Sequence, residues 1–233
     1  MKNKGNITIR IIDATKIYGD QTVLNRISLE MRSGVIYGFV GQNGSGKTVL
    51  FKSICGFTKL SKGQIQVLGK NVGEDVDMAE GVGAIIENPG FLANYNAFKN
   101  LKFLAALNNK IDDDEIRRNI VLVGLDPYSK KKVGKFSLGM RQRLGIAQAI
   151  MENPDILILD EPFNGMDKNG TKEIRELLLR MKEDGKTILL ASHSADDIEI
   201  LCDEVYEMEM GICTKRRWES EWERRTYVEF SIN

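Results

Sequence analysis

The chain has 233 residues, with 33 basic and 33 acidic side chains. This length allows a large hydrophobic core, and the zero net charge excludes a global field that would gather the chain on nucleic acid or on an acidic membrane surface. No stretch approaches the ~18 apolar residues of a transmembrane helix or resembles a signal peptide. The three widely spaced cysteines, Cys55, Cys202 and Cys213, indicate idle thiols in a reducing compartment. We therefore expect a globular cytosolic protein that binds no nucleic acid.

The first part of the chain predicts a β-rich layer that leads into a phosphate-binding loop. Residues 7–41 alternate short apolar runs with turn signals. The loop follows the apolar run 35–40 and consists of Gly41, Gln42, Asn43, Gly44, Ser45, Gly46, Lys47 and Thr48. Its glycines let successive backbone N–H groups point at one phosphate, while Lys47 supplies a cation and Thr48 supplies a hydroxyl for Mg²⁺.

A helix is expected directly after this loop, because Val49, Leu50, Ile54 and Phe57 are apolar at roughly helical spacing. Its N-terminus would present a partial positive charge to the same phosphates. A glycine-rich surface turn is the alternative. The strand and helix signals on both sides of the motif favour the phosphate-binding loop.

The middle of the chain changes from strands to helices. A strand pair is expected within 63–87, and 94–152 is expected to be mainly helical. Phe98, Leu101 and Ala105 recur on one face of a first helix, and the acidic run 112–115 is suited to begin a second.

The last third of the chain predicts a βαβ unit with two carboxylates at its edge. Residues 156–159 and 187–191 are apolar on both faces, as in a parallel sheet, and a helical pattern lies between them. Asp160 and Glu161 end the first of these strands, beside the phosphate loop. Asp160 is placed to hold Mg²⁺, and Glu161 is the candidate general base for the attacking water. An Asp-Glu pair alone is more often structural, and the neighbouring loop favours the catalytic interpretation.

The single histidine, His193, follows the second of these strands. An imidazole at that edge can donate to a γ-phosphate. A packed or solvated histidine is the alternative, but the position at the same sheet edge favours a catalytic role.

From about Ile7 to Gly211 the chain resembles the nucleotide-binding subunits of ATP-binding cassette (ABC) transporters. Beyond the residues above, the segment 136–143 resembles the signature sequence of that family, and 164–167 resembles its dimer-contact loop. Tyr18 resembles the aromatic residue that stacks on adenine; without the resemblance it would be interpreted as core or turn packing. The resemblance implies an α/β fold: a P-loop NTPase core with a mostly parallel sheet, an N-terminal antiparallel β subdomain and an inserted α-helical subdomain.

The resemblance also implies the organisation of the chain and its partners. A single ABC ATPase domain is expected over 1–213, with the helical subdomain at about 90–152 and a tail over 214–233. Two subunits are expected to meet head to tail, so that each ATP lies between one phosphate loop and the Ser137 and Gly139 region of the second copy or a homologue. ATP and Mg²⁺ are the expected cofactors. An integral membrane permease is the expected partner, at the cytoplasmic face of the membrane.

Two positions depart from the family pattern. Leu138 stands where a glycine is usual, which restricts the backbone beside Ser137. Glu87 stands where a glutamine is usual, and we expect this carboxylate to contribute to the metal site and to raise metal dependence. Together with Pro89-Gly90-Phe91, Glu87 resembles the ATP-binding subunits of bacitracin-resistance and lantibiotic-immunity exporters. Neutral drift from glutamine in any exporter is the alternative.

The leading hypothesis is therefore an ATPase that energises an exporter of peptides or amphiphiles. The alternative is a soluble, ATP-gated assembly factor that clamps a cytosolic partner. A regulator that binds nucleotide without hydrolysis is disfavoured, because Glu161 is present. In the tail, Trp218 and Trp222 have the spacing of a docked helix, with packing on the domain and a surface for a partner as the two alternatives.

Overall fold

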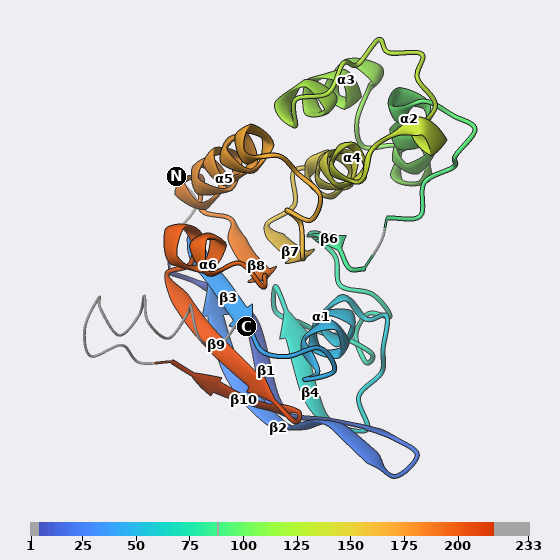
Figure 1. Cartoon of the computed structure of the whole chain (residues 1–233). Helices are drawn as coiled ribbons and strands as arrows, with labels where there is room; N and C mark the ends of the chain where they lie inside the picture. Colours follow the sequence, from blue (N-terminus) through green and yellow to red (C-terminus); the bar gives the residue numbers. More distant parts are fainter. Residues whose placement is uncertain (1–4, 88, 217–233) are drawn as a thin grey trace.

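The structure is a computed structural model that describes residues 5–87 and 89–216. Its centre is a six-stranded sheet (Figure 1). Across this sheet the order is β10 (Ile212–Lys215), β9 (Glu204–Glu209), β3 (Ile36–Val40), β8 (Thr187–Ala191), β7 (Ile156–Asp160) and β6 (Val82–Ile85). Neighbouring strands are parallel except for the pair of β10 and β9. The strands β3, β7 and β8 are buried along their whole length, which explains why they are apolar on both faces.

A second, antiparallel sheet packs beside the first. Its strands are, in order, β2 (Gln21–Arg32), β1 (Ile7–Tyr18), β4 (Lys62–Val67) and β5 (Lys70–Asn71). One core cluster joins the two sheets to the first helix, and its centre is aromatic. The ring of Phe39 stacks on Tyr206 at 5.6 Å and meets Phe51 edge-on at 5.3 Å. The predicted β-rich layer is confirmed.

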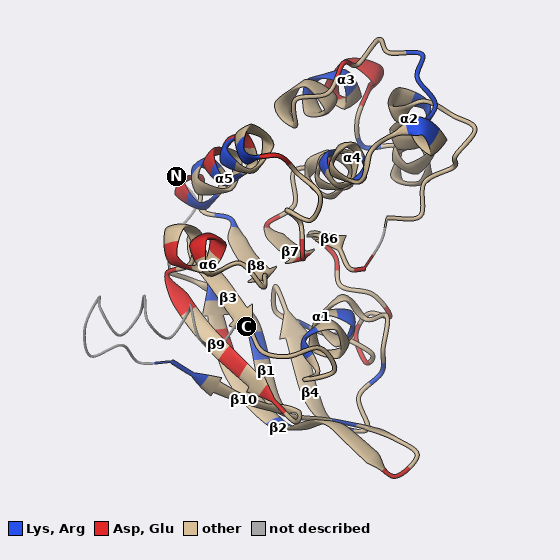
Figure 2. Cartoon of the chain, in the orientation of Figure 1, with Lys and Arg blue, Asp and Glu red and all other residues tan. Residues whose placement is uncertain are grey.

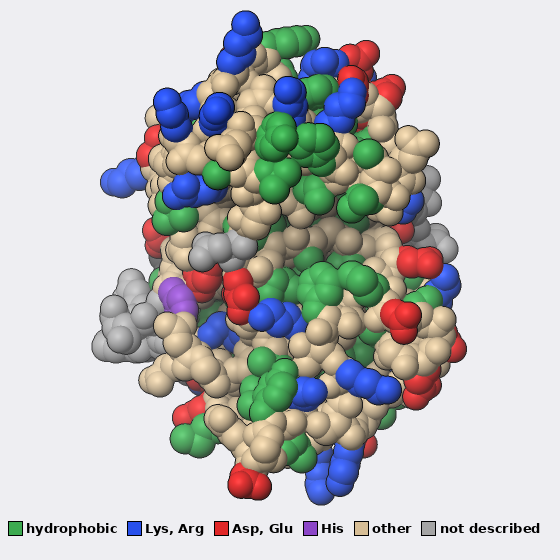
Figure 3. All heavy atoms as spheres, turned by 90° about the vertical axis from the view of Figure 1, so that its right-hand side faces the viewer, with side chains coloured by type: hydrophobic (Ala, Val, Ile, Leu, Met, Phe, Trp, Pro, Cys, Tyr) green, Lys and Arg blue, Asp and Glu red, His purple; other side chains and the backbone are tan. Residues whose placement is uncertain are grey.

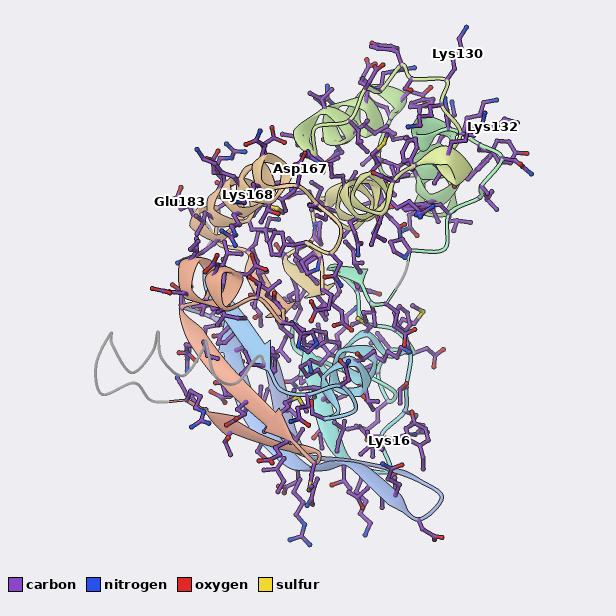
Figure 4. The ribbon with its side chains drawn as sticks, viewed as in Figure 1. Lys16, Lys130, Lys132, Asp167, Lys168 and Glu183 are labelled. Atoms are coloured by element: carbon purple, nitrogen blue, oxygen red, sulfur yellow. The ribbon has the colours of Figure 1, made fainter. Side chains whose placement is uncertain are left out.

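In the part of the chain that the structure describes, the α-helices are α1 (Lys47–Cys55), α2 (Ala97–Asn108), α3 (Asp113–Leu122), α4 (Leu138–Ile150), α5 (Lys168–Glu183) and α6 (Ala195–Leu201). Of these, α2, α3 and α4 lie together at one end of the molecule (Figure 1), so the prediction of a helical 94–152 segment is confirmed. Short polar side chains cap the starts of α2 to α6. Asp112 accepts from the N–H of Glu115 at 2.8 Å, and Asp167, labelled in Figure 4, accepts from the N–H of Gly170 at 2.7 Å.

Arg143 on α4 links the helical end to α5 through its guanidinium group. Its guanidinium donates to the carbonyl of Val123 at 2.5 Å and pairs with Glu173 at 2.8 Å. Gly124 and Gly170 leave the space that it occupies, because a Cβ at either position would fall 2.2 or 2.5 Å from a guanidinium nitrogen. This half-buried cation therefore adds a polar connection to the shared hydrophobic core that joins the helical end to α5 and the central sheet.

Several elements differ from the sequence expectations. The segment 63–87 is not one strand pair: β4 and β5 pair in the second sheet, while β6 joins the central sheet. Phe57 lies beyond α1 and is exposed, because Gly56 ends the helix in the left-handed region at φ 89°. Strand β10 extends to Lys215, past the predicted end of the domain at residue 213. Trp218 and Trp222 lie outside the described residues.

Basic and acidic residues are spread over many elements of the fold, and acidic residues gather on α6 and β9 (Figure 2). Some of these carboxylates are paired, as Glu204 is with Lys215 at 2.8 Å.

Cys55 and Cys202 are buried and Cys213 is half-buried, all as free thiols. Within residues 5–87 and 89–216, no helix is both long and apolar enough to cross a membrane.

Candidate functional site

Three parallel strands bring the predicted residues to one edge of the central sheet. Strand β3 leads into the glycine-rich loop, β7 ends at Asp160, and β8 is followed by His193. Since β8 lies between β3 and β7 in register, the carboxyl ends of all three strands meet. The loop, the carboxylates and the histidine therefore converge, although Thr48 and Asp160 are 112 residues apart in the chain and Asn43 and His193 are 150 apart.

The loop requires glycine at specific positions. Gly41, Gly44 and Gly46 have φ values of 143°, 82° and 109°, which L side chains rarely adopt. A Cβ at Gly41 would lie 2.2 Å from the carbonyl oxygen of Met208, and one at Gly46 would lie 2.7 Å from that of Val23. Helix α1 begins after Gly46 without a side-chain cap. The N–H groups of its first turn are thus available to an anion.

Lys47 lies across this loop. Its ammonium donates to the carbonyl of Gly41 at 2.5 Å and to that of Gln42 at 3.1 Å. Burial lowers the pKa of Lys47, while the carboxylates of Asp160 and Glu161 act in the opposite direction. The cation is held inside the loop by these two carbonyl oxygens and lines the cavity of the site, a position that suits a phosphate ligand.

Thr48 and Asp160 form a pair of hard oxygen donors. The hydroxyl of Thr48 donates to a carboxylate oxygen of Asp160 at 2.8 Å, and Asp160 is buried. This donor set fits Mg²⁺, which accepts one or two protein oxygens when phosphates and water supply the rest. Among the residues described, no group of three or more His, Cys, Asp or Glu side chains could hold a metal by itself.

Glu161 has a strained backbone and a perturbed carboxyl group. Its φ is 51°, in the left-handed region that a residue with a Cβ disfavours. Its N–H donates to the carbonyl of Ala191 at 2.9 Å, and the N–H of His193 donates to its carboxylate at 3.4 Å. Burial, as the largest cause, raises the pKa of Glu161 to about 7. A carboxyl group with a pKa near neutrality is matched to general-base chemistry.

The ring of His193 lies between Glu161 and the loop. Its Nε2 is 3.3 Å from a carboxylate oxygen of Glu161 and 3.2 Å from the side-chain oxygen of Asn43. Burial lowers the pKa of His193. The imidazole is therefore positioned at the mouth of the site as a hydrogen-bonding group.

The raised pKa of Glu161 predicts a pH-dependent stability. Between the unfolded-state pKa near 4.5 and the folded value near 7, the unfolded chain releases its proton first, so the contribution of Glu161 to stability is lost as pH rises. We expect Glu161→Gln to raise the free energy of unfolding of the nucleotide-free protein by up to about 3 kcal/mol at pH 8, with little change at pH 4.5. Thermal melts of both proteins across this range would measure it. A pH-independent difference would contradict the assignment.

A cavity of about 420 Å³ occupies this sheet edge. Ten predicted site residues line it: Asn43, Gly44, Ser45, Gly46, Lys47, Thr48, Glu87, Asp160, Glu161 and His193. Sequence reasoning did not single out Val23 or Gln142, which also line it. Val23 carries no sequence signal, whereas Gln142 falls inside the segment 136–143 and could have been found there.

Four predicted residues lie outside the cavity lining. Gly41 lies behind the loop against Met208, and Tyr18, 49% exposed, lies at the end of β1 under the ammonium of Lys16 (labelled in Figure 4). Ser137 caps α4 by accepting from the N–H of Met140 at 3.2 Å. A Cβ at Gly139 would lie 2.5 Å from the carbonyl oxygen of Gly165. Helix α4 thus begins at Leu138 with an ordinary N-terminal cap from Ser137.

A buried ion pair supports the segment that carries His193. The guanidinium of Arg175 donates to one oxygen of Asp197 at 2.9 Å, and the hydroxyl of Ser192 donates to the other at 2.8 Å. The N–H of Ser194 donates to the same hydroxyl at 3.1 Å. Asp197 is 2% exposed, so water contributes little to the stabilisation of its charge. The carboxylate therefore depends on the hydrogen bonds from Arg175 and Ser192.

We expect Asp197→Asn to lower the free energy of unfolding by about 1–3 kcal/mol, because it leaves the guanidinium of Arg175 without its counter-charge. Chemical denaturation would measure the loss. Asp196→Asn, an exposed neighbour in the same helix turn, is the control and should remain within about 0.5 kcal/mol. Equal effects of the two changes would argue against a special role of the buried pair.

Residues 24–164, more than half of the chain, match the ABC transporter family. The chain belongs to this family. It is 44% identical over 203 residues to YybJ of Bacillus subtilis (strain 168), an uncharacterized ABC transporter ATP-binding protein, covering 87% of this chain and 93% of YybJ. It is 39% identical over 223 residues to the bacitracin transport ATP-binding protein BcrA of Enterococcus faecalis, covering 94% and 72%. The lantibiotic transport ATP-binding protein SrtF of Streptococcus pyogenes is 35% identical over 195 residues, covering 84% of each chain.

The fold agrees with this membership. A nucleotide-free ATP-binding cassette from an ABC transporter superposes with a TM-score of 0.81 at 22% identity, covering 96% of each chain. The predicted α/β fold, with a mostly parallel central sheet and an antiparallel second sheet, is confirmed. The chain is the ATP-binding ATPase subunit of an ABC transporter.

Proposed function

We propose that this ABC ATPase hydrolyses ATP to power the export of peptide antibiotics or other amphiphiles through a separate membrane permease, at the cytoplasmic face of the membrane. The observation that carries ATP hydrolysis is the convergence of Lys47, Thr48, Asp160 and Glu161 on one cavity beside the glycine-rich loop. Export of such compounds is supported by the names of BcrA and SrtF and by the extent of the similarity to them.

In this proposal each of the following residues that line the cavity has one role in ATP hydrolysis. Lys47 and the loop N–H groups neutralise the β- and γ-phosphates, and Thr48 and Asp160 hold Mg²⁺. The metal, when bound, supplies charge neutralisation on the phosphates. Glu161 accepts a proton from the attacking water, and His193 donates to the γ-phosphate.

The proposed working unit is a head-to-tail dimer of this chain with a second copy or a homologue. Ser137 and Gly139 lie at the start of α4, where backbone N–H groups suit an anion. We propose that they contact the γ-phosphate held by the other subunit, and that Tyr18 stacks on adenine. The exposure of Tyr18 and Ser137, outside the cavity of their own chain, supports this arrangement.

The permease would dock on the apolar face of the helical end. Leu92, Tyr95 and Phe103 are exposed, and the rings of Tyr95 and Phe103 meet edge-on at 5.1 Å. Figure 3 shows hydrophobic side chains gathered on this face above a hollow, with basic side chains around them. Lys130 and Lys132 project from the connection between α3 and α4 (Figure 4).

Affinity capture of the tagged chain from gently solubilised membranes of its own host tests this proposal. A polytopic partner in fixed stoichiometry, lost with Tyr95→Ala/Phe103→Ala but retained with Val121→Ala on α3, is the expected result. Host cells that lose the chain should also lose tolerance to bacitracin or to a lantibiotic. A soluble partner alone would support a cytosolic assembly factor instead.

Glu87 is proposed as an accessory metal-site residue. In the nucleotide-free structure its carboxylate pairs with Lys52 at 2.8 Å, at the edge of the cavity. We expect Glu87→Gln to raise the Mg²⁺ concentration for half-maximal ATP turnover about two- to fivefold, because a neutral amide binds Mg²⁺ less strongly. Glu80→Gln, which also breaks an exposed pair with a lysine, is the control. An unaltered Mg²⁺ titration would defeat this proposal.

A further inference from the structure

Helix α4 reaches the backbone of Glu161 through a single buried side chain. Gln142 is 4% exposed, and its amide nitrogen donates to the carbonyl oxygen of Glu161 at 3.3 Å. Its other polar atom, the carbonyl oxygen Oε1, is buried without a hydrogen-bond partner in the described structure. A buried amide with only one of its two polar atoms hydrogen-bonded is costly to stability, which points to a role other than stabilising the fold.

The peptide that Gln142 contacts needs support. Glu161 holds φ at 51°, and such strained residues persist when their surroundings fix them. The N–H of Glu161 is fixed by β8 through Ala191, as described above. Its carbonyl oxygen is held from the other side by Gln142 and accepts a long bond of 3.4 Å from the N–H of Asn164. The orientation of the carboxyl group thus depends on α4 as well as on the sheet.

Helix α4 is also packed against both segments that flank the site. A Cβ at Gly139 would overlap the carbonyl oxygen of Gly165, and a Cβ at Gly145 would lie 2.8 Å from the ring of Pro89. Gln142 lies between these two contacts and lines both the cavity of the site and a second cavity of about 340 Å³ bounded by Pro89, Leu138 and Arg141. Figure 1 shows α4 beside the segment that follows β7. A shift of the helical end relative to the sheet would therefore displace Gln142 with it.

We propose that Gln142 is a positioning residue that aligns Glu161 from helix α4, so that the rate of ATP hydrolysis depends on the placement of the helical end. The inference deepens the proposed function and rests on Glu161 as the general base. In this proposal the helical end regulates hydrolysis within one subunit. The packing of α4 sets the position of Gln142, and the hydrogen bond from Gln142 sets the orientation of the Glu161 peptide group.

The test is Gln142→Met, which keeps an unbranched side chain of similar length but removes the amide. We expect kcat for ATP to fall about tenfold, with KM and the affinity for a fluorescent ATP analogue unchanged, because only the alignment of the base is lost. Thermal stability should be maintained or increased, since the unpartnered buried oxygen is also removed. A residue that only supports the fold would instead lower stability and activity together.

Gln148→Met, on the same helix but away from the cavity, is the matched control and should leave kcat unchanged. Gln142→Asn provides a second variant, because its shorter amide cannot reach Glu161 and should also lower kcat at constant KM. An unchanged kcat in either Gln142 variant, or a fall in kcat that follows a fall in stability, would overturn the inference. Failure of the proposed function is distinguishable, because Glu161→Gln would then retain the turnover of the unaltered protein.

Discussion

Glu161→Gln should abolish most ATP turnover while leaving ATP bound. The change keeps the shape of the side chain but removes the group that accepts the proton of the attacking water, a contribution of about 10²–10⁴-fold. The contacts that hold phosphate, Lys47 and the loop N–H groups, are not altered. Steady-state phosphate release and equilibrium binding of ATP would measure the two effects separately. We also expect ATP to drive the variant into a stable dimer, visible by light scattering, because hydrolysis no longer releases it.

Glu176→Gln is the matched control for this experiment. Glu176 lies exposed on α5, away from the cavity, so the same chemical change there should leave turnover within about twofold. Retained turnover in Glu161→Gln would exclude Glu161 as the base. Loss of ATP binding together with turnover would instead indicate that the carboxylate organises the binding site.

Lys47→Met should weaken ATP binding about 10- to 100-fold, because the charge-assisted hydrogen bonds of the ammonium to the phosphates are removed. Turnover at saturating ATP should fall a further ~10²–10³-fold, since the same cation stabilises charge that develops in the transition state. Isothermal titration with ATP and Mg²⁺, followed by phosphate release at saturation, would separate these effects.

Lys62→Met, an exposed change on β4, is the control for general effects of replacing a lysine. It should alter neither affinity nor turnover. The prediction for Lys47 would be contradicted by ATP affinity within threefold of the unaltered protein. If Lys47→Met also lowered thermal stability, the weaker binding would be explained by the loss of two hydrogen bonds in the nucleotide-free protein. These are the bonds from the Lys47 ammonium to the carbonyls of Gly41 and Gln42.

Local sequence patterns determined most of the elements around the site. The apolar runs of β3, β7 and β8, buried on both faces, could be identified because a central parallel strand tolerates few polar residues. The glycines at 41, 44 and 46 predicted a loop for phosphate because their backbone angles exclude other residues. The acidic run that starts at Asp112 marked a helix start for a similar local reason, the need to satisfy free N–H groups.

Sheet membership and side-chain contacts were decided by the tertiary structure. Nothing local separates β5 from β6, yet one completes the antiparallel sheet and the other joins the central one, because pairing depends on which edge is free after the layers pack. The same holds for Glu87, which pairs with Lys52 across space, and for Gln142, whose contact with Glu161 needs α4 to lie against the end of β7. The sequence by itself determined the chemistry of the site, because phosphate binding requires particular residues in a fixed local order. Only the tertiary structure decided which distant side chains support that chemistry, because burial and hydrogen bonding between separate elements arise when the layers pack together.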